Sequence, residues 1–245
     1  MREKLKKIIE NIIPNKFQLG FRYSYLKLFN KLDTEMFYIS KRLNNNRRFI
    51  DIGANVGIYS YHFRNIFKNI DSFEPINEIT YRIKALNCSN IHIHNIALSN
   101  QNGHRKLNIP VINGVAVQAR ASIENADNEK KNLNIETRTL DSYGFDDVDL
   151  IKIDVEGHEE SVIIGAQETI KKNMPLLLIE IEQRHINKDI SEIHNILLNM
   201  NYDGFFLKNG EIISITDFDY NIHQKAIKNE MSKNYINNFI FIPRK

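Results

Sequence analysis

The chain has 245 residues, 42% of them hydrophobic and 10% aromatic, so it is long and apolar enough to bury one α/β core with extra sequence at an end. Its formal net charge of +3 is too weak to indicate a nucleic-acid partner. The single cysteine, Cys88, excludes an intramolecular disulfide and indicates a reducing compartment. No apolar run has the length of an integral membrane segment, and no secretory signal pattern is found. We therefore expect a cytoplasmic globular protein.

Residues 1–45 are predicted to form a helical extension in front of a larger domain at 46–245. Apolar residues recur at helical spacing in the first segment, with lysines between them: Leu5, Ile8, Ile9, Ile12 and Ile13. The pair Pro14-Asn15 interrupts this segment, and further helix is expected through Arg42. These helices are expected to pack on their own domain or on a second copy, so a homo-oligomer is a candidate assembly. A membrane-surface contact is the less favoured alternative.

Strands and helices alternate in the larger domain. Strands are expected at 49–52, 70–74, 91–97, 148–153 and 176–181, and helices near 56–67, 78–86, 160–171 and 190–200. Largely apolar strands in such an alternation predict a parallel sheet covered on both faces. A hairpin at 202–215 with an Asn209-Gly210 turn, and a last strand at 238–242, predict an antiparallel ending.

A long polar stretch, residues 99–147, separates the third and fourth of these strands. Its Asn102-Gly103 and Asn113-Gly114 pairs predict short hairpins. An excursion at this point of the fold would overhang the carboxyl ends of the strands.

The sequence Asp51-Ile-Gly53-Ala54-Asn55-Val-Gly57 follows the first predicted strand and can open a helix. A strand, a glycine turn and a helix in this order cradle a nucleotide-like ligand. The glycines let the backbone approach the ligand closely, and a helix start offers free N–H donors.

Two acids narrow the choice of ligand. Glu74 lies roughly twenty residues after the turn, where a carboxylate accepts hydrogen bonds from ribose hydroxyls; capping of the next helix is the alternative. Asp51 stands at the head of the turn, where it would repel a diphosphate. A cationic, phosphate-free nucleoside such as S-adenosylmethionine suits Asp51, although this acid could equally hold the N–H groups of its own turn.

Four sequence segments together resemble the FkbM-type family of S-adenosylmethionine-dependent methyltransferases, over roughly residues 47–245. They are 51–57, the triplet Phe73-Glu74-Pro75, the run Asn95-Ile-Ala97-Leu98-Ser99, and Leu150-Ile-Lys152-Ile-Asp154-Val-Glu156-Gly157. The resemblance implies a Rossmann-like class I methyltransferase α/β fold, with a seven-stranded, mostly parallel sheet whose last strand is antiparallel. The positions expected to contact the cofactor are Asp51, Gly53, Ala54, Asn55, Gly57, Glu74, Pro75, Asn95, Ala97 and Asp154.

A sugar hydroxyl is a poor nucleophile at neutral pH, so a general base or a metal is expected beside the transferred methyl group. The candidates for the base are Asp154, Glu156 and His158, which follow the fourth strand. Two of them have a structural alternative: Glu156 can act as a favourable charge at a helix start, and His158 can face solvent. For Glu159 the charge at the helix start is the favoured interpretation.

Glu180 ends the fifth strand and could join Asp154 in holding a divalent cation such as magnesium, although a paired or solvated carboxylate is favoured. Arg120 and Ser122, in the long excursion, are candidates for substrate contact.

The resemblance also implies an O-methyltransferase that acts on a sugar or natural-product hydroxyl, and this is the function we predict, with a small-molecule or glycan acceptor. The alternatives are an NAD-dependent oxidoreductase, which would need a fuller glycine fingerprint, and a non-catalytic cofactor-binding module of the same fold. A nucleic-acid methyltransferase is disfavoured because the chain lacks a base-flipping motif.

Overall fold

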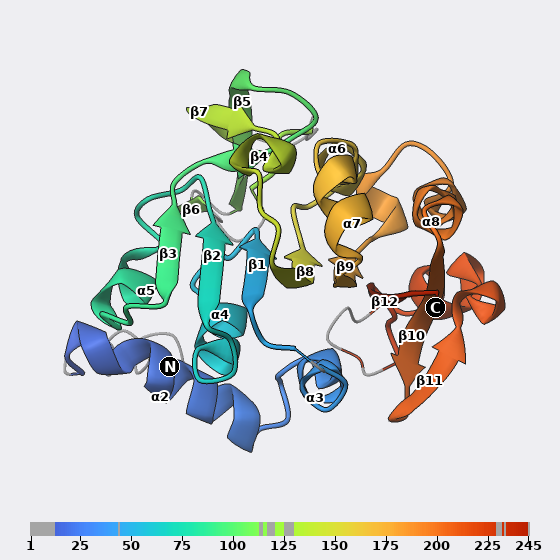
Figure 1. Ribbon diagram of the computed structural model, residues 1–245, viewed down its shortest axis with the longest axis horizontal. Helices are drawn as coiled ribbons and strands as arrows, with labels where there is room; N and C mark the ends of the chain where they lie inside the picture. The colour runs from blue at the N-terminus through green and yellow to red at the C-terminus, as the bar shows by residue number, and fades with distance from the viewer. Residues whose placement is uncertain are drawn as a thin grey trace.

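A central sheet of eight strands organises the computed structural model, which describes residues 13–43, 45–112, 115–116, 121–124, 130–228, 232 and 234–244. The strand order is β11-β10-β12-β9-β8-β1-β2-β3 (Figure 1). The bounds are β1 Arg48–Ile52, β2 Asn69–Phe73, β3 Ile91–His94, β8 Val148–Ile153, β9 Leu176–Glu180, β10 Tyr202–Lys208, β11 Glu211–Ser214 and β12 Asn238–Pro243.

Five neighbouring strands of this sheet run parallel, as expected: β3, β2, β1, β8 and β9. Strand β12 pairs antiparallel with both β9 and β10. The family resemblance implied seven strands, whereas the sheet has eight. The hairpin that turns at Asn209-Gly210 adds β11 at the edge of the sheet, antiparallel to β10. Both turn residues have positive φ, 54° and 84°, which is the conformation that an Asn-Gly hairpin favours.

Helices cover both faces of the sheet. Their bounds are α2 Asn15–Leu28, α3 Thr34–Ser40, α4 Ile58–Phe63, α5 Tyr81–Ala85, α6 Glu159–Ile164, α7 Gln167–Asn173 and α8 Ile190–Asn199. The single helix expected at 160–171 is two helices, α6 and α7. They separate at Gly165, where a Cβ atom would lie 2.0 Å from the carbonyl oxygen of Ser99. The backbone of another segment therefore occupies the space that a side chain would need.

Alternate residues of each central strand belong to different apolar clusters, as the two-residue period of a strand requires. Ile50 and Ile151 belong to one cluster with residues of α6, α7 and α8. Phe49 and Leu150 belong to a second cluster, which includes Phe63 of α4 and residues of α3. Both faces of the sheet are thus buried.

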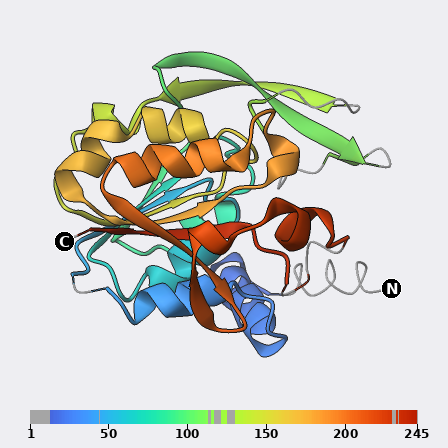
Figure 2. The same ribbon diagram turned by 90° about the vertical axis from the view of Figure 1, so that its right-hand side faces the viewer.

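The long excursion forms a long antiparallel ribbon, and it includes one of the short hairpins expected, because residues 111–112 pair antiparallel with residues 115–116. Its strands are β5 Gly103–Ile112 and β7 Lys130–Arg138, with the short strands β4 Ala97–Leu98 and β6 Val115–Ala116 beside them. The third expected strand therefore ends early, at His94, because residues 97–98 pair with β7. The ribbon projects beyond the arrowheads of β2 and β3 (Figure 1) and lies along one edge of the molecule in the second view (Figure 2). The expected turn at Asn113-Gly114 lies outside the described residues.

The helix α2 packs on α4 and α5 as an outer layer. The apolar pattern at Leu5 to Ile12 lies outside the described residues. No helix in the described parts of the chain is long and apolar enough to cross a membrane. Helix α3 shares an apolar cluster with Phe49 of β1, so the helices before residue 45 pack on the same core as the larger domain. The domain boundary at residue 45 therefore stays a prediction.

Candidate functional site

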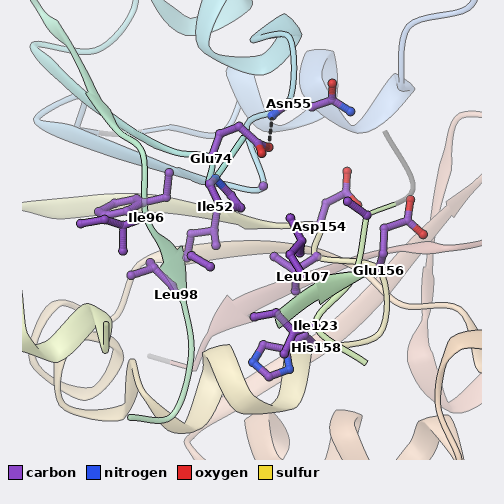
Figure 3. A pocket seen from close by; sticks show the side chains of 16 residues that line it. Ile52, Asn55, Glu74, Ile96, Leu98, Leu107, Ile123, Asp154, Glu156 and His158 are labelled. Carbon is purple, nitrogen blue, oxygen red and sulfur yellow. Dashed lines mark hydrogen bonds between the residues drawn. The ribbon is translucent and has the colours of Figure 1, made fainter. Parts of the chain in front are cut away.

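A cleft opens at the carboxyl ends of the parallel strands, beneath the ribbon. Its walls come from β1, β2 and β8 with their following loops, from β4, and from the ribbon: Ile52, Gly53, Asn55, Phe73, Glu74, Pro75, Ile96, Ala97, Leu98, Leu107, Ala121, Ile123, Asp154, Val155, Glu156 and His158. Figure 3 shows Ile96 and Leu98 on one side of this cleft and Asp154 and Glu156 on the other.

The turn after β1 is packed too closely to hold side chains at its glycines. A Cβ atom at Gly53 would lie 1.8 Å from the carbonyl oxygen of Asp154, and one at Gly57 would lie 2.2 Å from Cγ1 of Ile83. Both glycines have positive φ, 74° and 89°. The glycines predicted from the sequence thus serve close backbone approach and left-handed turns.

The N–H groups of this turn already have acceptors inside the protein. The N–H groups of Gly53 and Ala54 both donate to the carbonyl oxygen of Phe73 at 3.0 Å. The N–H of Asn55 donates to Oε2 of Glu74 at 3.0 Å, and the N–H of Gly57 donates to the carbonyl oxygen of Ala54. These four donors are therefore not free to bind a diphosphate.

Glu74 projects into the cleft from the end of β2 (Figure 3). Its other oxygen, Oε1, accepts from the N–H of Ile76 at 2.9 Å. Each carboxylate oxygen of Glu74 therefore accepts one backbone hydrogen bond and can accept a second from a ligand. Burial raises the pKa of Glu74 to about 7, although both backbone donors oppose this shift.

Asp51 lies behind the turn, fully buried, and does not line the cleft. Its Oδ2 accepts from the hydroxyl of Ser60 at 2.5 Å and from the N–H of Ser60 at 3.2 Å, and the Ser60 hydroxyl also contacts that of Ser72. Burial raises the pKa of Asp51, which the charge of Lys152 opposes. The carboxylate thus joins β1 to α4, and its expected contact with a cofactor stays a prediction.

Apolar side chains from β4 and the ribbon segment also line the cleft, with Ala97, Leu98, Leu107 and Ile123 among them. Asn95, expected beside Ala97 in the cofactor site, instead donates to the carbonyl oxygen of Glu74 at 3.0 Å and accepts from Lys84 at 3.1 Å. It does not line the cleft, so its position supports the Glu74 loop.

His158 is 3% exposed and therefore does not face solvent. Its Nε2 lies 2.9 Å from the hydroxyl of Ser99, and its Nδ1 lies 2.7 Å from Oε1 of Glu124 in the ribbon segment. The hydrogen bond to His158 lowers the pKa of Glu124. Because both ring nitrogens have partners, His158 would have to break a bond before it could take a proton.

Lys152 and Asp154 share one face of β8, as their spacing predicts, and form an ion pair at 2.9 Å. The Lys152 ammonium group also donates to the carbonyl oxygen of Gly53 at 3.3 Å and lies over the ring of Tyr59. Burial lowers the pKa of Lys152, but the charges of Asp154 and Asp51 more than offset this, so its pKa is raised. This buried cation fixes the Asp154 carboxylate at the edge of the cleft.

Two more acids follow Asp154 in the loop before α6. Glu156 has a φ of 53° and lies 3.2 Å from Nδ1 of His185; burial and the charge of Asp154 raise its pKa to about 8. Glu159 accepts from the N–H groups of Gly157 and Val155, which agrees with the structural interpretation of this residue. Burial raises the pKa of Glu159 to about 7.

Glu180 ends β9 and accepts from Nδ2 of Asn237 at 2.6 Å. Burial and the charge of Asp154 raise its pKa well above the ordinary value. Among the described residues, no group of three or more His, Cys, Asp and Glu side chains is arranged to hold a metal ion. Magnesium is commonly held by one or two carboxylates with waters completing its octahedral shell, so the expected site at Asp154 and Glu180 stays a prediction.

Sequence reasoning missed three contributors to the site. Asp33 accepts from the hydroxyl of Tyr59 at 2.8 Å, and the charge of Asp33 raises the pKa of Glu180. Ser99 and Glu124 hold His158. Asp33 and Glu124 lie in no motif, and Ser99 lies in the 95–99 run but without a predicted contact to His158, so only the tertiary structure identifies these contacts. Of the substrate candidates, Ser122 bonds the carbonyl oxygen of Glu156 at 2.6 Å, and Arg120 lies outside the described residues.

The family comparison matches residues 51–204, more than half of the chain, to the methyltransferase FkbM domain. A comparison with curated proteins gives no match. Among solved structures, the methyltransferase FkbM from Methylobacillus flagellatus aligns with a TM-score of 0.51 at 17% identity, covering 80% of this chain and 43% of that one. An rRNA methylase from Streptococcus thermophilus aligns with a TM-score of 0.43 at 9% identity, covering 84% and 91%.

The chain thus spans less than half the length of the Methylobacillus protein, and at 17% identity this likeness shows the fold alone. It is a methyltransferase-like α/β fold with a mostly parallel central sheet, in agreement with the strand order above. The family match begins at Asp51 and includes the glycine turn, Glu74 and the segment from Lys152 to His158. The chain therefore belongs to the methyltransferase FkbM domain family.

Proposed function

We propose that the chain is an S-adenosylmethionine-dependent methyltransferase that methylates a hydroxyl group of a sugar or natural product. The cofactor would lie in the cleft, with its adenine against the apolar wall that includes Ile96 and Leu98 and its ribose at Glu74. The acceptor would lie at the acidic side, beside Asp154 and Glu156.

The observation that carries this proposal is the hydrogen bonding of the glycine turn. Four of its N–H groups are already bonded within the protein, whereas dinucleotide-binding turns leave such donors free for the diphosphate. Glu74 offers acceptor capacity for ribose hydroxyls in the same cleft. A nucleoside without phosphate fits this donor and acceptor set, and NAD does not.

The cofactor, when bound, supplies a methyl group on a positively charged sulfur. The protein has to hold the acceptor oxygen in line with that methyl group and to accept the hydroxyl proton. Asp154, fixed by Lys152, is placed to orient the hydroxyl. Glu156, with its pKa raised to about 8 by burial, is the better proton acceptor, because a base is most effective when its pKa lies near the working pH.

The cofactor assignment is tested by calorimetric titration with S-adenosylhomocysteine and with NAD. We expect binding of S-adenosylhomocysteine only. Glu74→Gln should weaken it at least about tenfold, since the ribose loses an ionised acceptor. Glu159→Gln is the matched control, because Glu159 is also buried, also accepts two backbone N–H groups and does not line the cleft.

The control should bind S-adenosylhomocysteine like the unaltered protein. Binding of NAD, or equal affinities in the two variants, would contradict the assignment.

A further inference from the structure

We propose that the outer face of α2 binds the surface of a membrane that contains anionic lipids. The proposal concerns a surface remote in sequence from the cleft and does not depend on the proposed reaction.

Large apolar side chains recur on one face of α2 and continue at its C-cap. Their exposed fractions are 56% for Phe17, 48% for Phe21, 45% for Tyr25, 76% for Leu28 and 55% for Phe29. The spacings of four, four and three residues place the first four side chains along one stripe of the helix. These five residues are most of the eight large hydrophobic side chains that are strongly exposed in the described parts of the chain.

The opposite face of α2 is fixed to the protein. Leu19 is fully buried, and Gln18 accepts from the hydroxyl of Tyr81 at 3.0 Å. The hydroxyl of Tyr23 lies 2.6 Å from Nδ1 of His62 in α4. Figures 1 and 2 both place α2 at the outer edge of the molecule. Among the described residues, α2 therefore presents the stripe outward, where it can lie on a flat surface.

The charges of α2 have a single sign. Between Asn15 and Leu28 the helix contains Lys16, Arg22 and Lys27 and no aspartate or glutamate. Lys16 and Lys27 are exposed, and both fall on the same flank of the stripe by helical spacing. Aromatic and leucine side chains bordered by lysines are the composition of helices that lie in the interface of anionic membranes.

This charge pattern favours a bilayer over a second copy of the chain. A symmetric dimer through α2 would bring the cations of one helix toward those of the other, with no carboxylate on either helix to offset them. An anionic bilayer provides both an apolar layer for the stripe and negative charge for its flank.

The test is co-sedimentation of the full chain with vesicles of phosphatidylcholine, with and without phosphatidylserine. We expect binding to the phosphatidylserine vesicles only. Phe17→Ser with Phe21→Ser should reduce the partition at least about tenfold, because exposed apolar area is lost. Lys16→Gln with Lys27→Gln should reduce it roughly fivefold for each lysine.

The matched control is Ile222→Ser, which removes a side chain that is 59% exposed on another element and should leave vesicle binding unchanged. Unaltered thermal unfolding would show that the α2 variants fold. Failure of the unaltered chain to bind, or equal binding by the Phe17 and Phe21 variant, would overturn the proposal. A dimer in sedimentation velocity that the same variant dissociates, without vesicle binding, would assign the stripe to a second copy instead.

Discussion

The two sides of the cleft differ in how their polar groups are satisfied. On the apolar side the one acid, Glu74, has a backbone donor for each oxygen. On the acidic side, Asp154 and Glu156 line the cleft, and Glu180 ends the neighbouring strand β9. Burial and the charge of Asp154 raise the pKa of both glutamates; Lys152 opposes this shift at Glu180, and Arg184 opposes it at Glu156. The first arrangement fixes a shape that can select a ligand, whereas the second raises the pKa of Glu156 to about 8 and so favours proton transfer.

The largest effect should come from the point where the two sides meet. Gly53→Ala would place a methyl group against the backbone of Asp154, and relief would require the β1 and β8 loops to separate. We expect loss of measurable S-adenosylhomocysteine binding and a decrease in the free energy of unfolding of about 3–5 kcal/mol. Calorimetry and urea unfolding measure the two effects.

Gly144→Ala is the control for Gly53→Ala, because Gly144 has a similar φ of 66° but no atom within 4 Å of an added Cβ. Gly144→Ala should therefore lower the free energy of unfolding by only about 1–2 kcal/mol, which is the cost of the left-handed backbone for a residue with a side chain. Equal losses in the two variants would mean that the close approach to Asp154 is unimportant.

A smaller effect, confined to one side of the cleft, is expected for Asp154→Asn. The substitution removes the charge beside Lys152 and keeps the backbone carbonyl that packs on Gly53. Transfer of labelled methyl from S-adenosylmethionine to a panel of sugar acceptors should fall about 100-fold, while the affinity for S-adenosylhomocysteine changes less than about threefold. A parallel loss of affinity would show that the two sides do not act separately.

The smallest effect is the pH dependence of stability. Burial raises the pKa of Glu35 and Glu159 to about 7 and that of Glu156 to about 8. A carboxyl group with a raised pKa binds its proton more tightly in the folded state, so its contribution is lost as pH rises through that pKa. Burial lowers the pKa of His62 and His194 to about 4. These two histidines therefore make the folded state more stable as the pH rises from about 4 to 6.5, which opposes the effect of the carboxyl groups. The carboxyl contributions decline from the ordinary pKa of 4.5 upward, and the histidines offset part of this decline only up to about pH 6.5, so we expect the clearest fall in stability between about pH 6.5 and 8.

Glu35→Gln should reduce that decline by roughly 1 kcal/mol in urea unfolding, since Glu35 is buried and belongs to no part of the cleft wall. Glu168→Gln, at a carboxyl that is 78% exposed, should leave the decline as it is. An unchanged pH profile in the Glu35 variant would refute the role of this buried carboxyl.

The parallel part of the sheet could be predicted from the sequence because its strands are apolar on both faces; β8 has the predicted bounds, 148–153. The ribbon could not be predicted, because its pairing joins residues 20 to 34 positions apart, from Pro110 with Lys130 to Gly103 with Thr137, in segments with no strong periodicity. Motif spacing placed Glu74, Asp154 and Glu156 in one cleft. It could not show that Asp51 bonds Ser60, or that Ser99 and Glu124 hold His158, because those contacts depend on tertiary packing.

The break between α6 and α7 connects two distant parts of the molecule. Gly165 does not line the cleft, yet its Cα faces the carbonyl of Ser99, whose hydroxyl bonds His158 in the cleft wall. A bulkier residue at 165 would push Ser99 away and tilt the imidazole ring. Ligand affinity should therefore respond to a change on the helical layer, at a position that no inspection of the binding surface would single out.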